Sequence, residues 1–269
     1  MSGALLVRAL RLREGGGRRA PVVIERNLRF YRRFWVVIVT GFFEPVFYLL
    51  AMGVGLGALV PGVTGPDGQQ ITYLAFVAPA LLGVSAMNGA VFESTVNTWV
   101  KLRFWKVFDG MLSTPLRPLD IALGEVTSSQ LRALGYAAVF LVIAASLGGI
   151  PSWWALLALP ASTLVGFAFS ALGTAVATWI RDWQDQELVQ VVILPMLLLS
   201  ATFFPVEVYP EAVQPLVWIS PLYHGVALMR GFTLGVIEPV LVVHAVVLVG
   251  ITLAAGAVAA RRFERLLKP

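Results

Sequence analysis

The feature that most constrains this chain is a run of 48 consecutive residues, 133–180, that contains no Asp, Glu, Lys or Arg. A bilayer core about 30 Å thick needs roughly 20 apolar residues for each helical span, so this run is long enough for two. Charged residues make up only 13% of the whole chain, whereas ordinary soluble domains contain about 25%. Long continuous apolar runs indicate helices, because the strands of membrane barrels are short and alternate in polarity. The sequence therefore predicts an all-α protein that crosses a membrane several times.

Charge-poor runs predict six transmembrane helices. Their expected ranges are 34–59, 73–92, 133–148, 153–179, 188–204 and 239–260. We expect a single transmembrane domain over residues 1–269, which consists of an N-terminal amphipathic segment (1–33), a six-helix membrane region (34–260) and a tail (261–269). The first segment lacks the pattern of a signal peptide. With nine basic and two acidic residues, it is expected to lie on anionic lipid head groups at the cytoplasmic surface.

The distribution of basic residues predicts the orientation of the chain. If both termini are cytoplasmic, the inner segments are 1–33, 93–132, 180–187 and 261–269. They contain nine, five, one and four Lys or Arg residues, which is 19 of the 20 in the chain, and only Arg230 remains outside. Cytoplasmic loops of membrane proteins are enriched in Lys and Arg. We therefore expect a multi-pass protein of the inner, cytoplasmic membrane with both termini inside the cell.

The segment 205–231 needs separate treatment, because residues 212–229 carry no charge and are long enough to cross the membrane. Several prolines would break a continuous helix there, and a crossing would place the basic C-terminal tail outside. We therefore predict an external re-entrant hairpin of two short helices between the fifth and sixth spans. The residues that define it are Pro205, Pro210, Pro215, Trp218 and Pro221.

The charged segment 93–132 contains an amphipathic pattern. At about 100° per residue, a helix over 99–112 would carry an apolar stripe on one side and charged residues on the other. Such a helix either anchors the chain on the lipid surface or docks a soluble partner. The stripe consists of Val100, Phe104, Val107, Phe108 and Met111, with Arg103, Lys106, Asp109 and Gly110 opposite and Trp105 in the same segment.

The sequence contains little that favours catalysis or ATP binding. None of its three Lys residues follows a Gly, so the phosphate-binding Gly-Lys-Ser/Thr loop is absent, and without Cys there is no thiolate chemistry. His224 and His244 fit no metal-ligand spacing, and no Ser/His/Asp or paired-carboxylate pattern stands out. We expect no enzyme activity, cofactor or metal in this chain.

Glu44 is the one carboxylate expected well inside a span. At about 1.5 Å per residue, it would lie about 15 Å beyond Phe34, close to the membrane midplane. A charge at that depth costs about 2.5 kcal/mol or more and usually faces a polar cavity, although a kinked, partly hydrated helix entry would explain it as well. Together with Thr202, Phe203 and Phe204 of the fifth span, Glu44 is a candidate for the border of a translocation path.

Three blocks of the sequence carry a family resemblance. They are 73–80 (YLAFVAPA), 105–125 (WKVFDGMLSTPLRPLDIALGE) and 203–231 (FFPVEVYPEAVQPLVWISPLYHGVALMRG). In these blocks the chain resembles the membrane subunit, or permease, of ABC-2 type exporters, in the branch that contains nodulation protein J and the daunorubicin permeases. Tyr223 departs from the pattern, because related sequences commonly carry a smaller polar residue at that position.

The resemblance implies partners and roles. Two cytoplasmic ABC ATPase subunits would bind ATP and Mg²⁺, and they would join two copies of this permease, or one copy and a related permease, in membrane lipid without nucleic acid. The helix 99–112 would be the coupling helix, and the hairpin 205–231 would cap the pathway.

The substrate stays open at this stage. Relatives export lipo-oligosaccharides, glycolipids, polysaccharides or hydrophobic drugs, as in multidrug efflux, and the sequence does not choose among these amphipathic substrates. Two other classes remain as alternatives. An intramembrane lipid-processing enzyme would need a catalytic pair, which we do not find, and a secondary transporter would usually need more intramembrane ionisable residues and an internal repeat.

Overall fold

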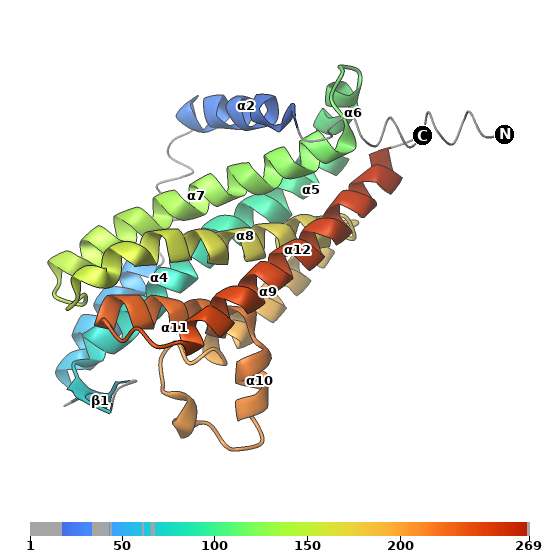
Figure 1. The fold of residues 1–269 in the computed structure, drawn as a ribbon. Coiled ribbons are helices and arrows are strands. Elements are labelled where there is room, and N and C mark those ends of the chain that lie inside the picture. The colour runs from blue at the N-terminus through green and yellow to red at the C-terminus, as the bar shows by residue number, and fades with distance from the viewer. Residues whose placement is uncertain (1–17, 34–42, 44, 61, 66–67, 268–269) are drawn as a thin grey trace.

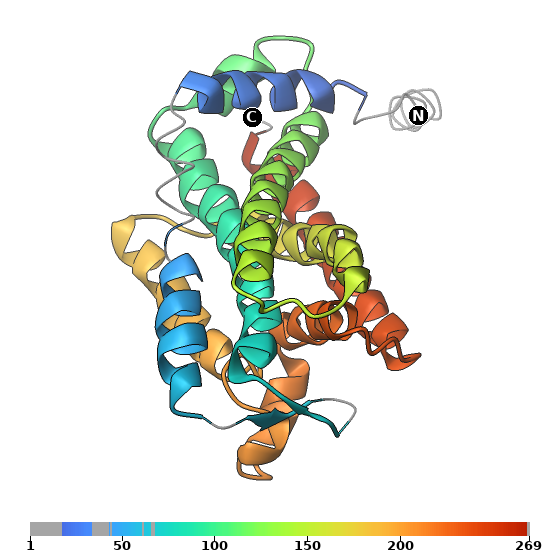
Figure 2. The ribbon, with the colours of Figure 1, turned by 90° about the vertical axis from the view of Figure 1, so that its left-hand side faces the viewer.

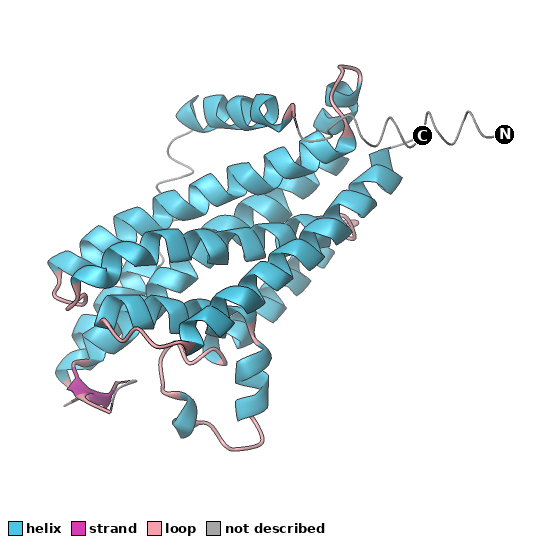
Figure 3. Cartoon of the chain, in the orientation of Figure 1, coloured by secondary structure: helices cyan, strands magenta, loops and turns pink. Residues whose placement is uncertain are grey.

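The computed structural model describes residues 18–33, 43, 45–60, 62–65 and 68–267, which form a bundle of helices and one small β-hairpin. Long helices run side by side through the bundle (Figure 1). The helix α2 (Ala20–Arg33) lies across one end, and the hairpin lies at the other end (Figure 2). Helices dominate the cartoon coloured by secondary structure (Figure 3). The prediction of a helical membrane protein is confirmed.

Four helices of the described chain are long and apolar enough to cross a membrane. The first combines α4 (Tyr73–Phe92), the π-helical turn η3 (Glu93–Asn97) and α5 (Thr98–Arg103). The second is α7 (Pro118–Ser146). The third joins the 3-10 turn η4 (Trp153–Leu157) to α8 (Ala158–Ala177), and the fourth is α12 (Val240–Leu267).

Shorter elements connect the long helices. An apolar helix, Pro45–Ala58, precedes the hairpin and contains η1 (Leu49–Gly55), which is π-helical, and the 3-10 turn η2 (Leu56–Ala58). In the hairpin, β1 (Val63–Thr64) pairs antiparallel with β2 (Gln70–Ile71), so that Val63 lies opposite Ile71. The remaining elements are α6 (Val107–Leu112), α9 (Trp183–Leu198), η5 (Val206–Val208), α10 (Gln214–Ile219) and α11 (Pro221–Leu234).

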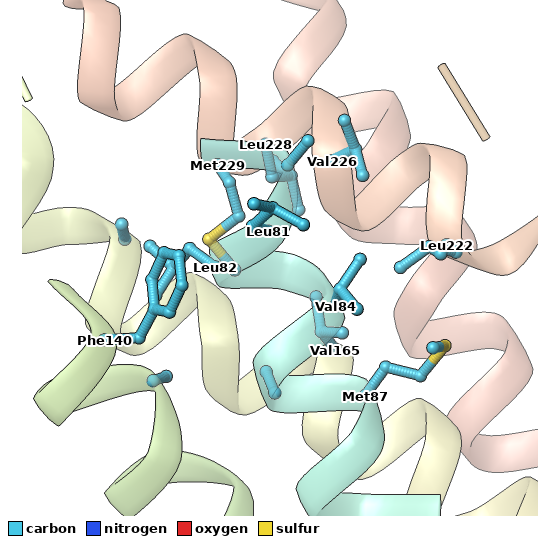
Figure 4. Packing of buried hydrophobic residues seen from close by; sticks show 14 of the residues in the cluster. Leu81, Leu82, Val84, Met87, Phe140, Val165, Leu222, Val226, Leu228 and Met229 are labelled. Atoms are coloured by element: carbon cyan, nitrogen blue, oxygen red, sulfur yellow. The ribbon is translucent and has the colours of Figure 1, made fainter. Parts of the chain in front are cut away.

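Helix α4 forms the centre of the bundle. It is apolar on all sides, as expected of a fully enclosed helix, and nearly all of its residues are buried among α7, α8 and α11. Figure 4 shows the side chains of Leu82 and Val84 in one cluster with Phe140 of α7, Val165 of α8 and Met229 of α11. The core therefore depends on a helix that touches protein rather than lipid.

The structure corrects the limits of several predicted spans. The helix of the third span begins at Pro118 rather than at residue 133. Residues 118–132 are helical rather than a loop, because their charged side chains are buried against other helices of the bundle. The second span continues past residue 92 to Arg103. In the fifth, α9 ends at Leu198 instead of reaching residue 204, and the chain then turns at Ala201, whose φ is 52°.

The first predicted span is only partly covered. Residues 34–42 and Glu44 lie outside the described residues, and the described part forms the helix Pro45–Ala58. This helix packs on α4 at Gly53, where an added Cβ would stand 2.6 Å from the Leu74 side chain. The six-span count stays a prediction.

The hairpin predicted over 205–231 contains two short helices, as expected. Ser220 alone separates α10 from α11, and Pro215 and Pro221 each stand in the first turn of a helix, where a missing N–H costs nothing. Helix α11 runs beyond the predicted limit and ends before Gly235, whose φ of 80° favours glycine. The prolines thus start helices rather than only interrupting one.

A second hydrophobic cluster joins α2 and α6 to α7 and α12. It lies at the end of the bundle opposite the β-hairpin. Val23 of α2 and Phe108 of α6 are both 1% exposed. Phe108 packs against Phe263 of α12 with ring centroids 5.6 Å apart, and Ile121 of α7 completes the contact. Gly124 of α7 makes room for α2, since an added Cβ would stand 2.5 Å from the Val23 Cβ.

Gly124→Val tests this docking of α2. The new side chain should displace α2 and destabilise the fold by about 1–3 kcal/mol, as overpacking usually does. Thermal unfolding of the purified protein and trypsin cleavage at Arg26 and Arg29 should both change. Gly135→Val on the same helix is the matched control, because an added Cβ there meets nothing within 4 Å. Equal melting temperatures for the two variants would contradict the packing described above.

Candidate functional site

A network of buried charges connects α5 to α7. Lys101 lies between two carboxylates, with its Nζ 3.2 Å from Glu93 Oε1 and 2.7 Å from Glu125 Oε2. Both carboxylate side chains are at most 1% exposed, and the Lys101 side chain is 9% exposed. Since a buried charge is tolerated only when it is paired and hydrogen-bonded, these three groups depend on one another.

Arg132 of α7 balances the network. Its Nη1 donates to Glu93 Oε2 at 3.1 Å, and its Nε and Nη2 donate to the Tyr136 hydroxyl at 3.0 and 2.8 Å. The guanidinium also lies 5.1 Å from the centroid of the Phe92 ring, a favourable position for a cation. Two carboxylates thus face two cations, so that the network carries no net charge.

Helix α2 closes the network from outside the bundle. The Nδ2 of Asn27 donates to Glu125 Oε1 and to Ser128 Oγ, each at 3.1 Å, and its Oδ1 accepts from Lys101 at 3.5 Å. Tyr31 lies beside Arg132, and burial, together with the nearby Glu93 carboxylate, raises the pKa of the Tyr31 hydroxyl well above its usual value. The network therefore holds three separate segments of the chain in one arrangement.

The helical register explains how distant residues meet. Glu125 and Arg132 are seven residues apart, so about two turns place them on one face of α7. Glu93 and Lys101 are eight residues apart, which in a regular helix would leave them about 80° out of line. The π-helical turn η3 takes up one extra residue between them and brings both onto the face that meets α7. Our sequence analysis placed residues 93–132 outside the spans and did not predict this network. The seven-residue spacing of Glu125 and Arg132 could have indicated that the two charges share one helix face.

The predicted coupling helix over 99–112 is not one helix. Helix α5 ends at Arg103, Lys106 adopts the left-handed conformation with φ 45°, and α6 begins at Val107. The prediction of a single apolar stripe is therefore wrong, because the break turns the two halves in different directions. Phe108 and Met111 are buried, Val100 and Val107 are half-buried, and Arg103, Phe104, Trp105, Lys106, Asp109 and Gly110 are exposed.

The break between α5 and α6 presents an aromatic turn, which we define as residues 103–106. Phe104 is 55% exposed and Trp105 is 62% exposed. Phe104 also packs edge-on against the buried Trp99, with centroids 5.0 Å apart, and lies 6.0 Å from the ring of Trp183. Packing against Trp99 and Trp183 thus holds the aromatic turn in place, while the outer faces of Phe104 and Trp105 are exposed, as a docking surface requires. Phe108 cannot be a docking anchor, because the chain's own α12 covers it.

A pocket of about 900 Å³ lies at the opposite end of the bundle, between the β-hairpin, α11 and the start of α12. Pro205 lines it, whereas Pro210, Pro215 and Trp218 are exposed and Pro221 is half-buried in the hairpin. Arg230, the one basic residue predicted outside, also lines this pocket. The predicted re-entrant hairpin therefore contributes part of a pocket wall.

The two histidines meet beside this pocket, although twenty residues separate them in the chain. His224 Nδ1 lies 2.8 Å from His244 Nδ1, and His224 Nε2 lies 3.0 Å from the Trp218 carbonyl oxygen. A carbonyl only accepts, so His224 Nε2 must carry a proton, and in a neutral pair His244 Nδ1 then donates to His224. No group of three or more metal-ligating side chains occurs in the part of the chain that is described.

The candidate path residues have different environments. Thr202 and Phe203 are buried, and the Phe203 carbonyl accepts a hydrogen bond from the Tyr73 hydroxyl at 3.3 Å. Phe204 is 51% exposed, and Glu44 lies outside the described residues. Of the three candidates that are described, Phe204 is the exposed one.

Comparison with known proteins gives consistent matches. The ABC-2 type transporter family profile matches residues 20–234. Nodulation protein J of Rhizobium leguminosarum bv. viciae is 33% identical over 223 residues, which cover 82% of this chain and 84% of that protein. Nodulation protein J of Rhizobium leguminosarum bv. trifolii is 36% identical over 194 residues, 71% of this chain and 72% of that protein. A probable doxorubicin resistance ABC transporter permease of Mycobacterium tuberculosis is 23% identical over 216 residues, 78% and 75% of the two chains.

The long apolar helices and these matches define a multi-pass helical protein of the cell membrane. The chain belongs to the ABC-2 type transporter family, which confirms the resemblance found in its sequence. It is a membrane subunit with a transport role, and membership of this family implies an ABC ATPase as partner.

Lys101→Met tests the charge network. It leaves Glu93 and Glu125 buried without their shared cation, and breaking a buried pair in this way typically costs about 3–5 kcal/mol. Adding Glu125→Gln to Lys101→Met should recover part of that loss, because one charge of each sign is then gone. Thermal unfolding followed by Trp fluorescence measures both effects. Lys106→Met, at an exposed position, is the control, and similar melting temperatures for the Lys101 and Lys106 variants would refute the network's structural role.

Proposed function

We propose that this chain is the permease subunit of an ATP-driven exporter that moves an amphipathic substrate outward across the cytoplasmic membrane. The observation that carries the proposal is the aromatic turn. Its Phe104 and Trp105 are exposed, and it directly follows α5, whose Lys101 belongs to the buried charge network. A partner that pushes on this turn acts on α5 and, through Lys101, on α7 and α2. The sequence lacks the phosphate-binding Gly-Lys-Ser/Thr loop, so in this proposal the work of ATP hydrolysis enters through such a contact.

The proposed orientation places the aromatic turn in the cytoplasm. Helix α2, α6 and the end of α12 gather at this end of the bundle (Figures 1 and 2). Helix α2 and the end of α12 contain seven Arg residues, whereas the β-hairpin and α10 at the other end contain no Lys or Arg, and such residues favour the cytoplasmic side. The β-hairpin and α10 then face outward, and the segment 205–231 caps the outer end without crossing.

The proposed complex contains two ABC ATPase subunits, which bind ATP and Mg²⁺, and a second permease, either a copy of this chain or a related one. Helix α9 supports a second permease. Of its residues only Gln186 and Leu197 are buried within this chain, while Leu188, Val191 and Leu194 are more than half exposed. An apolar face of this kind needs either lipid or another apolar helix against it.

The substrate is proposed to carry an apolar portion. A groove of about 700 Å³ between α8 and α9 is lined almost entirely by apolar side chains, including Phe169, Leu172, Val192 and Met196. Such a surface accepts an acyl chain or a hydrophobic drug, whereas a purely polar sugar would lose its water there without compensation. One similar protein is named for doxorubicin resistance and others for nodulation, so lipo-oligosaccharides, glycolipids and hydrophobic drugs are the candidates. Phe204 and Glu44 remain our candidates for the border of the path.

Trp105→Ala tests the docking surface. Aromatic anchors usually dominate helical interfaces, so Trp105→Ala with Phe104→Ala should reduce copurification of the ATPase by roughly ten-fold or more, equivalent to about 1.4 kcal/mol. Trp153→Ala is the control, because Trp153 is 72% exposed and begins η4, next to the end of α11. Phe108→Ala should lower the melting temperature of the permease itself. If the Trp105 variant retains its ATPase and transports normally, the turn does not couple the two subunits.

Cysteine labelling tests the proposed topology. The chain has no native Cys, so single cysteines near Gly65 and Gly235, at the exposed positions Thr64 and Ile237, can be labelled with a membrane-impermeant maleimide in intact cells. Both should react from outside, because they stand before and after the disputed segment. Labelling of the two positions from opposite sides would mean that 205–231 crosses the membrane and that the proposed orientation of the C-terminus is wrong.

A further inference from the structure

Arg230 is buried at the inner wall of the 900 Å³ pocket. It is 8% exposed, and its guanidinium stacks over the Phe76 ring at 3.9 Å from the centroid. Its Nε and Nη2 donate to the Phe76 carbonyl at 3.4 and 3.3 Å, and Nη2 also donates to the Ala201 carbonyl at 3.0 Å. These bonds fix the guanidinium to the start of α4 and to the turn after α9.

Among the described residues, the Arg230 guanidinium is attracted by the Glu207 carboxylate but forms no ion pair. Its Nη1 has no hydrogen-bond partner among the described residues. An arginine keeps its proton in proteins, and a buried unpaired charge is expensive. Arg132 in the same bundle shows the usual solution, since it binds Glu93 directly. Arg230 is therefore a site that an anion from outside the chain would complete.

The rest of the pocket indicates what kind of anion fits. Glu207 and Glu238 line the pocket and are exposed, so their negative charge opposes a free inorganic anion that approaches from solution. Val206, Val240 and Leu241 give much of the wall an apolar surface. An anionic group attached to an apolar chain gains from burial on these side chains as well as from Arg230, and thus overcomes the repulsion of the carboxylates.

We propose that this outer pocket binds the anionic group of an amphiphile, a phosphate, sulfate or carboxylate, on the guanidinium of Arg230. The inference rests on the proposed export function for its biological meaning, since the amphiphile is then the substrate at the outer end of its path. An anionic lipid of the outer leaflet presents the same chemistry. Tyr223, which also lines the pocket, offers a hydroxyl as a second donor to the anionic oxygens.

The test uses the full chain in phosphatidylcholine nanodiscs with Val208→Cys, at the rim of the pocket, labelled with bimane. Dodecyl phosphate should change the bimane emission at concentrations roughly ten-fold below those of the uncharged dodecyl maltoside, a difference of about 1.4 kcal/mol, because only the phosphate can form a charge-assisted hydrogen bond with Arg230. Arg230→Gln should abolish this preference, and Arg230→Lys should keep part of it. Arg265→Gln, which removes an exposed charge on α12, should leave the preference unchanged.

A competition experiment distinguishes a membrane lipid from an exported amphiphile as the molecule that carries the anionic group. If phosphatidylglycerol added to the discs competes with dodecyl phosphate in the wild-type chain, a lipid head group is the occupant; without competition, the occupant is an exported amphiphile. Ala227→Phe fills the pocket one turn before Arg230 and should also abolish the preference, so it replaces Arg230→Gln if that variant does not fold. Equal responses to the two detergents, or a preference that survives both variants, would overturn the proposal. The assay needs neither ATP nor the ATPase, so its failure is distinct from a failure of the export function.

Discussion

The arrangement of this protein depends on neutralising four charges inside an apolar bundle. Glu93, Lys101, Glu125 and Arg132 are all buried, and none can be left alone without a penalty of several kcal/mol. Their mutual pairing is possible only when α5, α7 and α2 hold one relative position. Apolar packing alone would let such helices slide, because most volume-conserving packings differ little in energy. We infer that the charges specify the register of this end.

This constraint connects the surface to the core. The aromatic turn follows directly after α5, and the neighbouring α6 inserts Phe108 into the cluster formed by α2, α7 and α12. A force on the turn therefore meets a single unit of several helices rather than a free loop. At the other end, Arg230 holds α11 to α4 through the Phe76 carbonyl. The central helix α4 spans the distance between the two ends and contacts both.

Sequence patterns predicted the parts of this structure that depend on one segment at a time. The long apolar helices, the two short helices after Pro205 and the exposed basic end follow from composition, proline positions and charge counts. The sequence-based predictions were incomplete where contacts between two distant segments determine the structure. The charged stretch 118–132 was expected to lie outside the spans, because its partners on η3, α5 and α2 are distant in the sequence. The regular 3.6-residue period likewise gave no sign of the left-handed break at Lys106. The pairing of His224 with His244 was equally invisible, since it requires α11 to lie against α12.

The most direct test of the account is site-specific photocross-linking in intact cells that express the permease with its ATPase. A benzoylphenylalanine at position 105 should cross-link to the ATPase, and the yield should change when ATP is depleted, if the turn receives the work of hydrolysis as we propose. The same group at position 153, at the start of η4 and next to the end of α11, should give no such product. A cross-link to the ATPase from position 153, or none from position 105 in an actively transporting complex, would contradict the central claim.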